Sequence, residues 1–162
     1  MFTRYIVDVY APGIEAVSIS GAARFAGMDK ITASSFRLNI SGYGKIEGSF
    51  ECSDFSARIS GSGEIDSNIV CKSLQIGVSG SGKITLSGQC NEMEIGISGS
   101  GDIIAREFPV NNANVRISGY GNVNIWVLDN LQANASGSGR IKYRGSPKID
   151  YKSSGSVRLE SD

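Results

Sequence analysis

The amino-acid sequence predicts an all-β protein in which repeats of about 19 residues stack as the rungs of a parallel β-helix. A Ser-Gly-(Ser/Tyr)-Gly tetrapeptide recurs at nearly constant spacing. Apolar residues alternate before each copy, and one apolar residue follows each copy at a fixed distance. Self-similarity at a short fixed period is typical of solenoid folds, and here it predicts about seven to eight rungs.

The spacing of the tetrapeptide is the main evidence for stacking. Successive copies are 19, 19, 19, 20 and 18 residues apart, and they begin at Ser41, Ser60, Ser79, Ser98, Ser118 and Ser136. Degenerate copies lie at 20–23 and 153–156. A sandwich of β-hairpins is the rival fold, but it would not require such regular spacing. The solenoid is therefore the favoured prediction.

Each tetrapeptide lies between two predicted strands. Apolar residues occupy the positions one, three and five residues before the first serine, as Ile40, Leu38 and Phe36 do in the first full copy. Alternation with a period of two predicts a strand with one buried face. A second short strand is predicted to begin five residues after the serine, at Ile46, Ile65, Ile84, Ile103, Val123 and Ile141.

The tetrapeptide glycines are predicted to form sharp corners between the two strands of each rung. We expect them to adopt positive φ angles, which other residues disfavour. The structural corner residues are Gly42, Gly44, Gly61, Gly63, Gly80, Gly82, Gly99, Gly101, Gly119, Gly121, Gly137 and Gly139.

Stacking turns each repeat position into a column of neighbours. Cys52, Cys71 and Cys90 all lie eleven residues after a corner serine, so they should form one column. We interpret it as a ladder of free thiols in the core, although neighbouring pairs would lie at disulfide range and their redox state stays open. In the column four residues after the serine, positive and negative charges alternate, as at Lys45 and Glu64. Opposite charges on adjacent rungs attract, so this column favours one register.

A third column holds the candidate ligand-binding residues. Arg106, Trp126 and Arg144 lie eight residues after successive corner serines, on the predicted outward face. Trp126 could then lie between two guanidinium groups in a cation–π stack and act as a platform for a sugar. The alternative is that the stack only covers the edge of a rung.

Composition excludes several classes of function. Lys+Arg and Asp+Glu both number 16, so the net charge is zero and argues against binding to nucleic acid or to a charged membrane surface. The sequence holds no histidine, and no transmembrane segment or metal site is evident. The closest pair of carboxylates in one column, Glu47 and Asp66, lies on a polar surface. We therefore predict no enzyme activity, no catalytic residue and no cofactor.

The residues of three segments resemble a known family. The Ser-Gly-Ala-Ala rung within 17–23, the Tyr-x-Gly-x-Pro motif within 141–149 and the Ser-Gly-Ser-Val ending at 154–157 are similar to the GIN domain. This family of auto-transporter adhesin head domains is common in Bacteroidetes-type bacteria. The resemblance implies a right-handed β-helix, export to the periplasm, outer membrane or cell surface, and no transferred catalytic residues. Family members usually carry a longer N-terminal stretch, so we expect a piece of a longer exported protein.

We expect residues 1–162 to form one solenoid domain. It would comprise an N-terminal strand and first rung over 1–19, the repeat array over 20–157 and a tail over 158–162. The predicted function is that of a non-enzymatic adhesin module that binds a glycan or an extracellular protein along an extended surface. A self-assembling, homo-oligomeric scaffold is the alternative, and a carbohydrate-active β-helix enzyme is less favoured.

Overall fold

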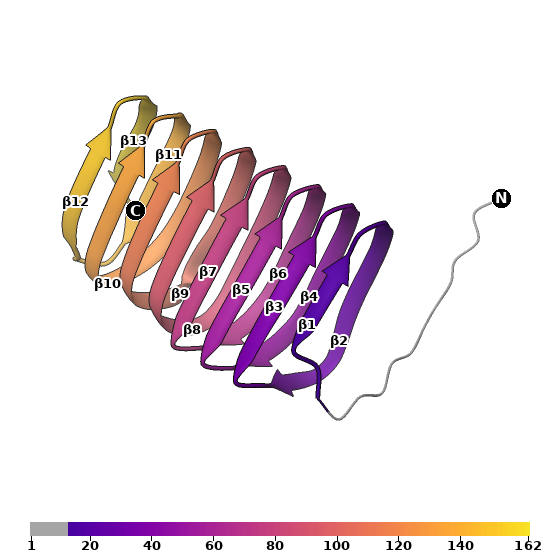
Figure 1. Cartoon of the computed structure of the whole chain (residues 1–162). Coiled ribbons are helices and arrows are strands. Elements are labelled where there is room, and N and C mark those ends of the chain that lie inside the picture. The colour runs from indigo at the N-terminus through magenta and orange to yellow at the C-terminus, as the bar shows by residue number, and fades with distance from the viewer. Residues whose placement is uncertain (1–12) are drawn as a thin grey trace.

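A computed structural model of the chain, which describes residues 13–162, is a parallel β-solenoid of about eight turns (Figure 1). The described residues form thirteen strands, all paired in parallel. They are β1 (Ala16–Ile19), β2 (Ala22–Thr32), β3 (Ser35–Ile40), β4 (Tyr43–Glu51), β5 (Asp54–Ile59), β6 (Ser62–Val70), β7 (Ser73–Val78), β8 (Ser81–Ile97), β9 (Ser100–Ile117), β10 (Tyr120–Ala135), β11 (Ser138–Arg144), β12 (Lys148–Ser153) and β13 (Ser156–Ser161).

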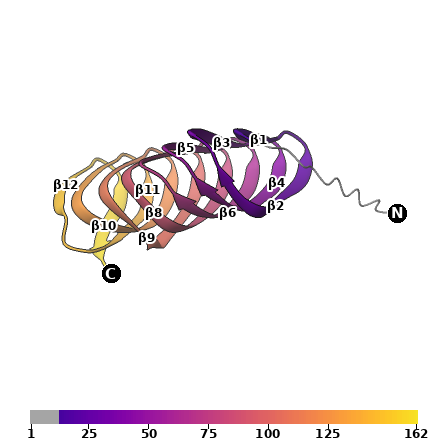
Figure 2. The ribbon, with the colours of Figure 1, turned by 90° about the horizontal axis from the view of Figure 1, so that it is seen from below.

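The strands form two rows that enclose the core. The first row runs through β1, β3, β5 and β7, then the C-terminal parts of β8, β9 and β10, and ends at β12. The second row runs through β2, β4 and β6, then the N-terminal parts of the same three long strands, and ends at β11 and β13. Viewed from below, the rungs follow one another along a single axis (Figure 2). The predicted parallel solenoid is confirmed; its right-handed sense stays a prediction.

The core is built from the columns that the alternation predicts. Ile46, Ile65, Ile84 and Ile103 stack in register and are fully buried. Toward the N-terminal end, the rings of Phe36, Phe50 and Phe55 pack together with centroids 4.6 to 5.8 Å apart. Each such side chain removed from water contributes about 1.5–3 kcal/mol to folding.

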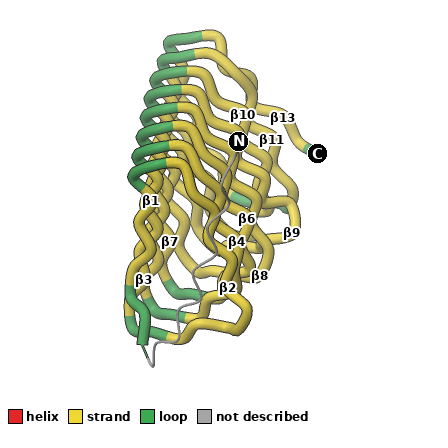
Figure 3. Tube along the Cα trace, turned by 90° about the vertical axis from the view of Figure 1, so that its right-hand side faces the viewer, coloured by secondary structure: helices red, strands yellow, loops and turns green. Residues whose placement is uncertain are grey.

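The corners stack above one another along one edge of the solenoid (Figure 3). At each of the six full tetrapeptides, the carbonyl of one isoleucine or valine in the preceding rung accepts bonds from two N–H groups of the corner. The carbonyl of Ile40, for example, accepts bonds from the N–H groups of Ser60 at 2.9 Å and Gly61 at 3.3 Å. The N–H group of Ser62 then donates to the carbonyl of Gly42 at 2.9 Å. The hydrogen-bond ladder thus continues through the corner with little interruption.

Two of the predicted strand boundaries differ from the structure. The second strand of each rung was expected five residues after the corner serine, but β6 begins only two residues after it, at Ser62. The third tetrapeptide residue already donates to the previous rung, so the strand begins there. At the other end, β13 pairs with β11 from Ser156 to Ser161, so most of the expected tail over 158–162 belongs to the solenoid.

The expected reason for the corner glycines is also wrong. Among the twelve of them, only Gly139 has a positive φ, of 138°. Glycine is needed at these positions because successive rungs lie too close together to leave room for a side chain. A Cβ atom on Gly80 would lie 2.0 Å from the carbonyl oxygen of Gly61, and the same clash recurs at the first glycine of every tetrapeptide. At the second glycine the obstacle is mostly an isoleucine side chain: a Cβ on Gly63 would lie 2.8 Å from Cδ1 of Ile40.

We predict that Gly80→Ala destabilises the solenoid, because the added methyl group forces two stacked backbones apart. Overpacking of this kind costs about 1–3 kcal/mol. The measurement is the free energy of unfolding in guanidinium chloride. Gly21→Ala is the matched control, since Gly21 holds the same corner position in the first rung and no described atom lies within 4 Å of an added Cβ. Equal stability of the two variants would contradict the stacking argument.

Candidate functional site

A groove of about 910 Å³ runs beside the row of corners, on the outer side of the first row of strands. We call it the serine groove. It spans several rungs rather than closing around one point, and its volume lies within the range of small-molecule sites. Its lining includes six corner serines, one from each of six successive rungs: Ser60, Ser79, Ser98, Ser118, Ser136 and Ser154. The last copy was expected at 153–156, but Ser153 pairs with Ala135, so the corner serine of that rung is Ser154.

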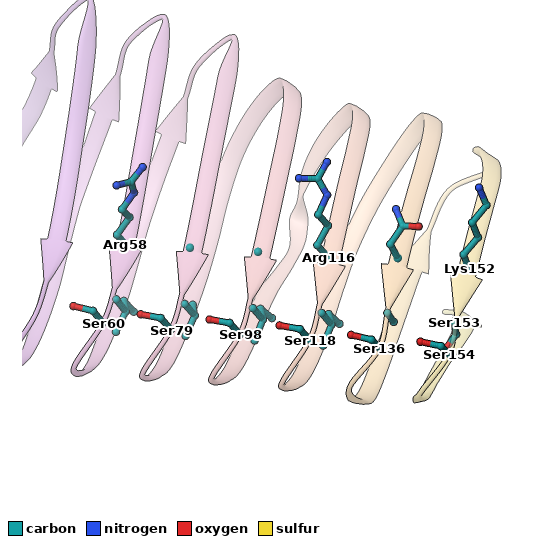
Figure 4. A pocket seen from close by; sticks show the side chains of 18 of the residues that line it. Arg58, Ser60, Ser79, Ser98, Arg116, Ser118, Ser136, Lys152, Ser153 and Ser154 are labelled. Atoms are coloured by element: carbon teal, nitrogen blue, oxygen red, sulfur yellow. The ribbon is translucent and has the colours of Figure 1, made fainter.

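The serines form a regular ladder because the rungs are in register. Each is exposed, and adjacent rungs place their hydroxyl groups about 4.8 Å apart. Figure 4 shows the labelled corner serines in a line. A hydroxyl group both donates and accepts hydrogen bonds. The groove therefore offers the same polar group repeatedly along the solenoid axis.

Every charged side chain that lines the serine groove is a cation. Arg58, Arg116 and Lys152 all lie two residues before a corner serine, in one column. A guanidinium Nη1 of Arg116 lies 3.2 Å from a carboxylate oxygen of Glu94, which leaves its other N–H groups free for further contacts. Arg58 forms no ion pair with the residues that the structure describes. The groove is thus locally positive in a chain of zero net charge.

Sequence analysis did not single out this groove. Its signal lies in the column of residues two before each corner serine, at the positions between the alternating apolar residues of the predicted strand. Two of its members, Gly77 and Gly96, lie side by side between arginine-bearing rungs, and glycine in a strand interior is a mark of bulges or of close ligand approach.

Trp126 and Arg144 lie together as predicted. The two residues are paired across β10 and β11, and the guanidinium carbon of Arg144 lies 4.3 Å from the centroid of the Trp126 ring. Trp126 is half-buried and Arg144 is exposed. The pair lies in the second row of strands and does not line the serine groove.

Arg106 does not complete the stack. The register between β9 and β10 shifts after Ile125, so that Trp126 lies opposite Pro109. Three residues of β9 have no partner on β10 at this shift: Arg106, Glu107 and Phe108. Arg106 instead forms an ion pair with Asp162. The expected sandwich of Trp126 between two guanidinium groups is therefore wrong, and among the described residues only Arg144 makes a cation–π contact with the ring.

We predict that Arg144→Gln lowers the free energy of unfolding by about 0.5–1 kcal/mol, the usual strength of an exposed cation–π contact. Lys142→Gln is the control, since Lys142 lies on the same strand and forms no ion pair within residues 13–162. Chemical denaturation measures both variants. If they lose equal amounts of stability, the stacking contact contributes nothing beyond a surface charge.

The three cysteines form the predicted column and are free thiols. The sulfur atoms of Cys71 and Cys90 lie 3.3 Å apart, and both residues are buried. The neighbouring sulfur of Cys90 and burial raise the pKa of the Cys71 thiol. Burial and the nearby carboxylate of Asp54 raise the pKa of the half-buried Cys52 thiol to about 11. The thiols of Cys52 and Cys71 therefore stay protonated at neutral pH.

Because a raised pKa keeps a thiol protonated until the pH approaches that value, we predict slow labelling of Cys52 at neutral pH. Its reaction with a disulfide reagent should speed up roughly tenfold per unit between pH 8 and 10, in proportion to the thiolate fraction. In native protein, one thiol should react before the other two, and Cys52→Ser should remove that phase. Simultaneous reaction of all three thiols would contradict the burial of Cys71 and Cys90.

The carboxylate pair that the sequence singles out, Glu47 and Asp66, lies on the second row of strands. Glu47 and Asp66 are adjacent in register, as predicted, but Glu47 is held by Arg24 and Lys45. Hydrogen bonds from Arg24 and then Lys45 lower the pKa of Glu47, and the bond to Glu47 raises the pKa of Lys45. Within residues 13–162, no cluster of histidine, cysteine and acidic residues is arranged to hold a metal ion. The same part of the chain has no helix of the length and apolarity needed to cross a bilayer.

The geometry defines a class of protein: a parallel β-solenoid that displays a long polar face with repeated hydroxyl groups. The chain belongs to the family described as "Putative auto-transporter adhesin, head GIN domain", whose model matches residues 2–147. That description is of an exported protein. No functionally curated protein matches the chain by sequence.

A crystal structure of a "Putative lipid binding protein" from Parabacteroides distasonis is similar to this solenoid. The TM-score is 0.77 and the sequence identity is 26%. The match covers 91% of this chain and 58% of the other, so this chain spans little more than half the length of that protein.

Proposed function

We propose that the protein is a non-enzymatic adhesin module that binds a glycan lengthwise along the serine groove, in the periplasm, at the outer membrane or at the cell surface. The serine ladder supports this proposal most strongly. A polymer of hydroxylated sugars can exchange hydrogen bonds with one serine per rung, and weak contacts along one ligand multiply into useful affinity. The family description is consistent with this role.

The half-buried ring of Trp126 and the exposed guanidinium of Arg144 favour a second, smaller contact with a sugar. Aromatic rings carry an apolar face, and the neighbouring guanidinium can donate hydrogen bonds. Arg106 makes no cation–π contact with Trp126 but forms an ion pair with Asp162. We therefore propose at most a peripheral role for Arg106 in sugar binding.

The test is a glycan and extracellular-matrix protein array, with the oligomeric state of the protein recorded by light scattering. We expect binding to glycans by a monomer, and loss of most of it in Ser98→Tyr, because a ring at Ser98 obstructs the middle of the serine groove. Trp126→Ala should cause a smaller loss. Association of the chain with itself and no binding would favour the scaffold alternative.

Ser100→Tyr is the matched control for Ser98→Tyr. Ser100 lies two residues further on, at the corner position that carries tyrosine naturally in Tyr43 and Tyr120, and it does not line the groove. It should bind as the unchanged protein does. Equal binding by both tyrosine variants would place the ligand elsewhere and overturn the groove as the binding face. Binding to matrix proteins alone would contradict the proposal that the ligand is a glycan.

A further inference from the structure

Gly77 and Gly96 have no structural reason to be glycine. Neither has a positive φ. A Cβ atom on Gly77 would have Cγ of Arg58 as its nearest neighbour, at 3.7 Å, and one on Gly96 would lie 3.9 Å from the carbonyl oxygen of Ile76. Both are ordinary van der Waals distances, in contrast to the clashes at the corners. Glycine weakens a strand interior, so the fold alone would favour a side chain at these positions.

The two glycines open a slot in the floor of the serine groove. They are adjacent in register, and Arg58 and Arg116 occupy the same column on the rungs at either side. Three rung spacings place the backbones of the two arginines about 14 Å apart. Figure 4 shows their side chains projecting on either side of the gap. The exposed hydroxyl groups of Ser79 and Ser98 border the slot toward the corners.

The chemistry of the slot is specific. Its floor is peptide backbone, against which a flat group can lie closely, and its two ends are guanidinium groups. Arginine binds carboxylate and sulfate groups through paired N–H donors. Glu94, at the edge of the slot, is already paired with Arg116 and leaves Arg58 without a carboxylate partner among the described residues. An anion is therefore the complementary ligand.

We propose that this slot binds an acidic sugar unit of a linear polysaccharide, with the ring on the backbone of Gly77 and Gly96 and the anionic group on Arg58 or Arg116. The inference rests on the proposed function, since it names the ligand class of the same groove. A uronate carboxylate and a sulfate ester offer the same chemistry to the arginines. The neighbouring serines bind the hydroxyl groups of the units that follow along the polymer.

The experiment measures binding of three probes by biolayer interferometry at low and physiological salt: a polyuronate, dextran sulfate and neutral dextran. We expect the polyuronate or dextran sulfate to bind at least tenfold more tightly than neutral dextran, and more weakly as salt rises. Whichever of the two binds more tightly identifies the anionic group. Gly77→Gln fills the slot without changing charge and should reduce acidic-probe affinity at least tenfold. Arg58→Gln should do the same and flatten the salt dependence.

Arg37→Gln is the matched control for Arg58→Gln, because Arg37 is an exposed arginine of the neighbouring strand β3 that forms no ion pair among the described residues and does not line the serine groove. It should bind as the unchanged protein does. The melting temperature of each variant is measured alongside, and we expect Gly77→Gln to fold, since nothing crowds the added side chain. If Gly77→Gln does not fold, the double variant Gly77→Ala with Arg58→Gln is measured in its place.

The outcomes separate this inference from the function on which it rests. Tight acidic-probe binding that Gly77→Gln leaves unchanged overturns the slot, and equal affinity for neutral dextran overturns the acidic ligand; in both cases glycan binding by the groove stands. Failure of all three probes and of a glycan array to bind overturns the slot and the proposed function together.

Discussion

The structure depends on how closely the backbone of one corner lies on the backbone of the next. The carbonyl oxygen of each first corner glycine occupies the space where a side chain of the following rung would begin. This closeness lets the amide groups of the corner donate to the rung before, so that the ladder passes from one row of strands to the other. Because the corners fix the register, every column in the core and on the surface is aligned by the same contact.

Because the corners align the rungs, the surface of the solenoid also repeats from one rung to the next. A residue type placed once per repeat becomes a line of identical groups at a constant interval, as the corner serines show. Such a face is suited to an elongated ligand with its own regular repeat, since each rung adds a similar contact. Charged residues on the surface follow the same columns, since Glu47 is paired both with Arg24 of the preceding rung and with Lys45 of its own strand.

The sequence was sufficient to predict the parallel solenoid, the buried columns and the contact between Trp126 and Arg144, because each follows from counting residues along a constant repeat. Counting failed where the repeat changes length. The register between β9 and β10 shifts by three residues at Arg106, and the location of this shift depends on packing that the spacing does not reveal. The corner glycines were located correctly for the wrong reason: a sequence shows that glycine is required, but only the distance to Gly61 shows that Gly80 needs space rather than a positive φ.

The same distances separate structural glycines from the two that the fold does not require. At the corners, glycine is the residue that the stacking backbone permits. At Gly77 and Gly96 a side chain would fit, and other rungs carry serine, asparagine, arginine or lysine in that column. Two adjacent exceptions in an otherwise side-chain-bearing column, placed between two arginines and beside the serine ladder, make the surface locally irregular. The core does not need this irregularity, and the proposed binding of an anionic ligand accounts for it, because the ligand would lie on the two glycines between the flanking cations.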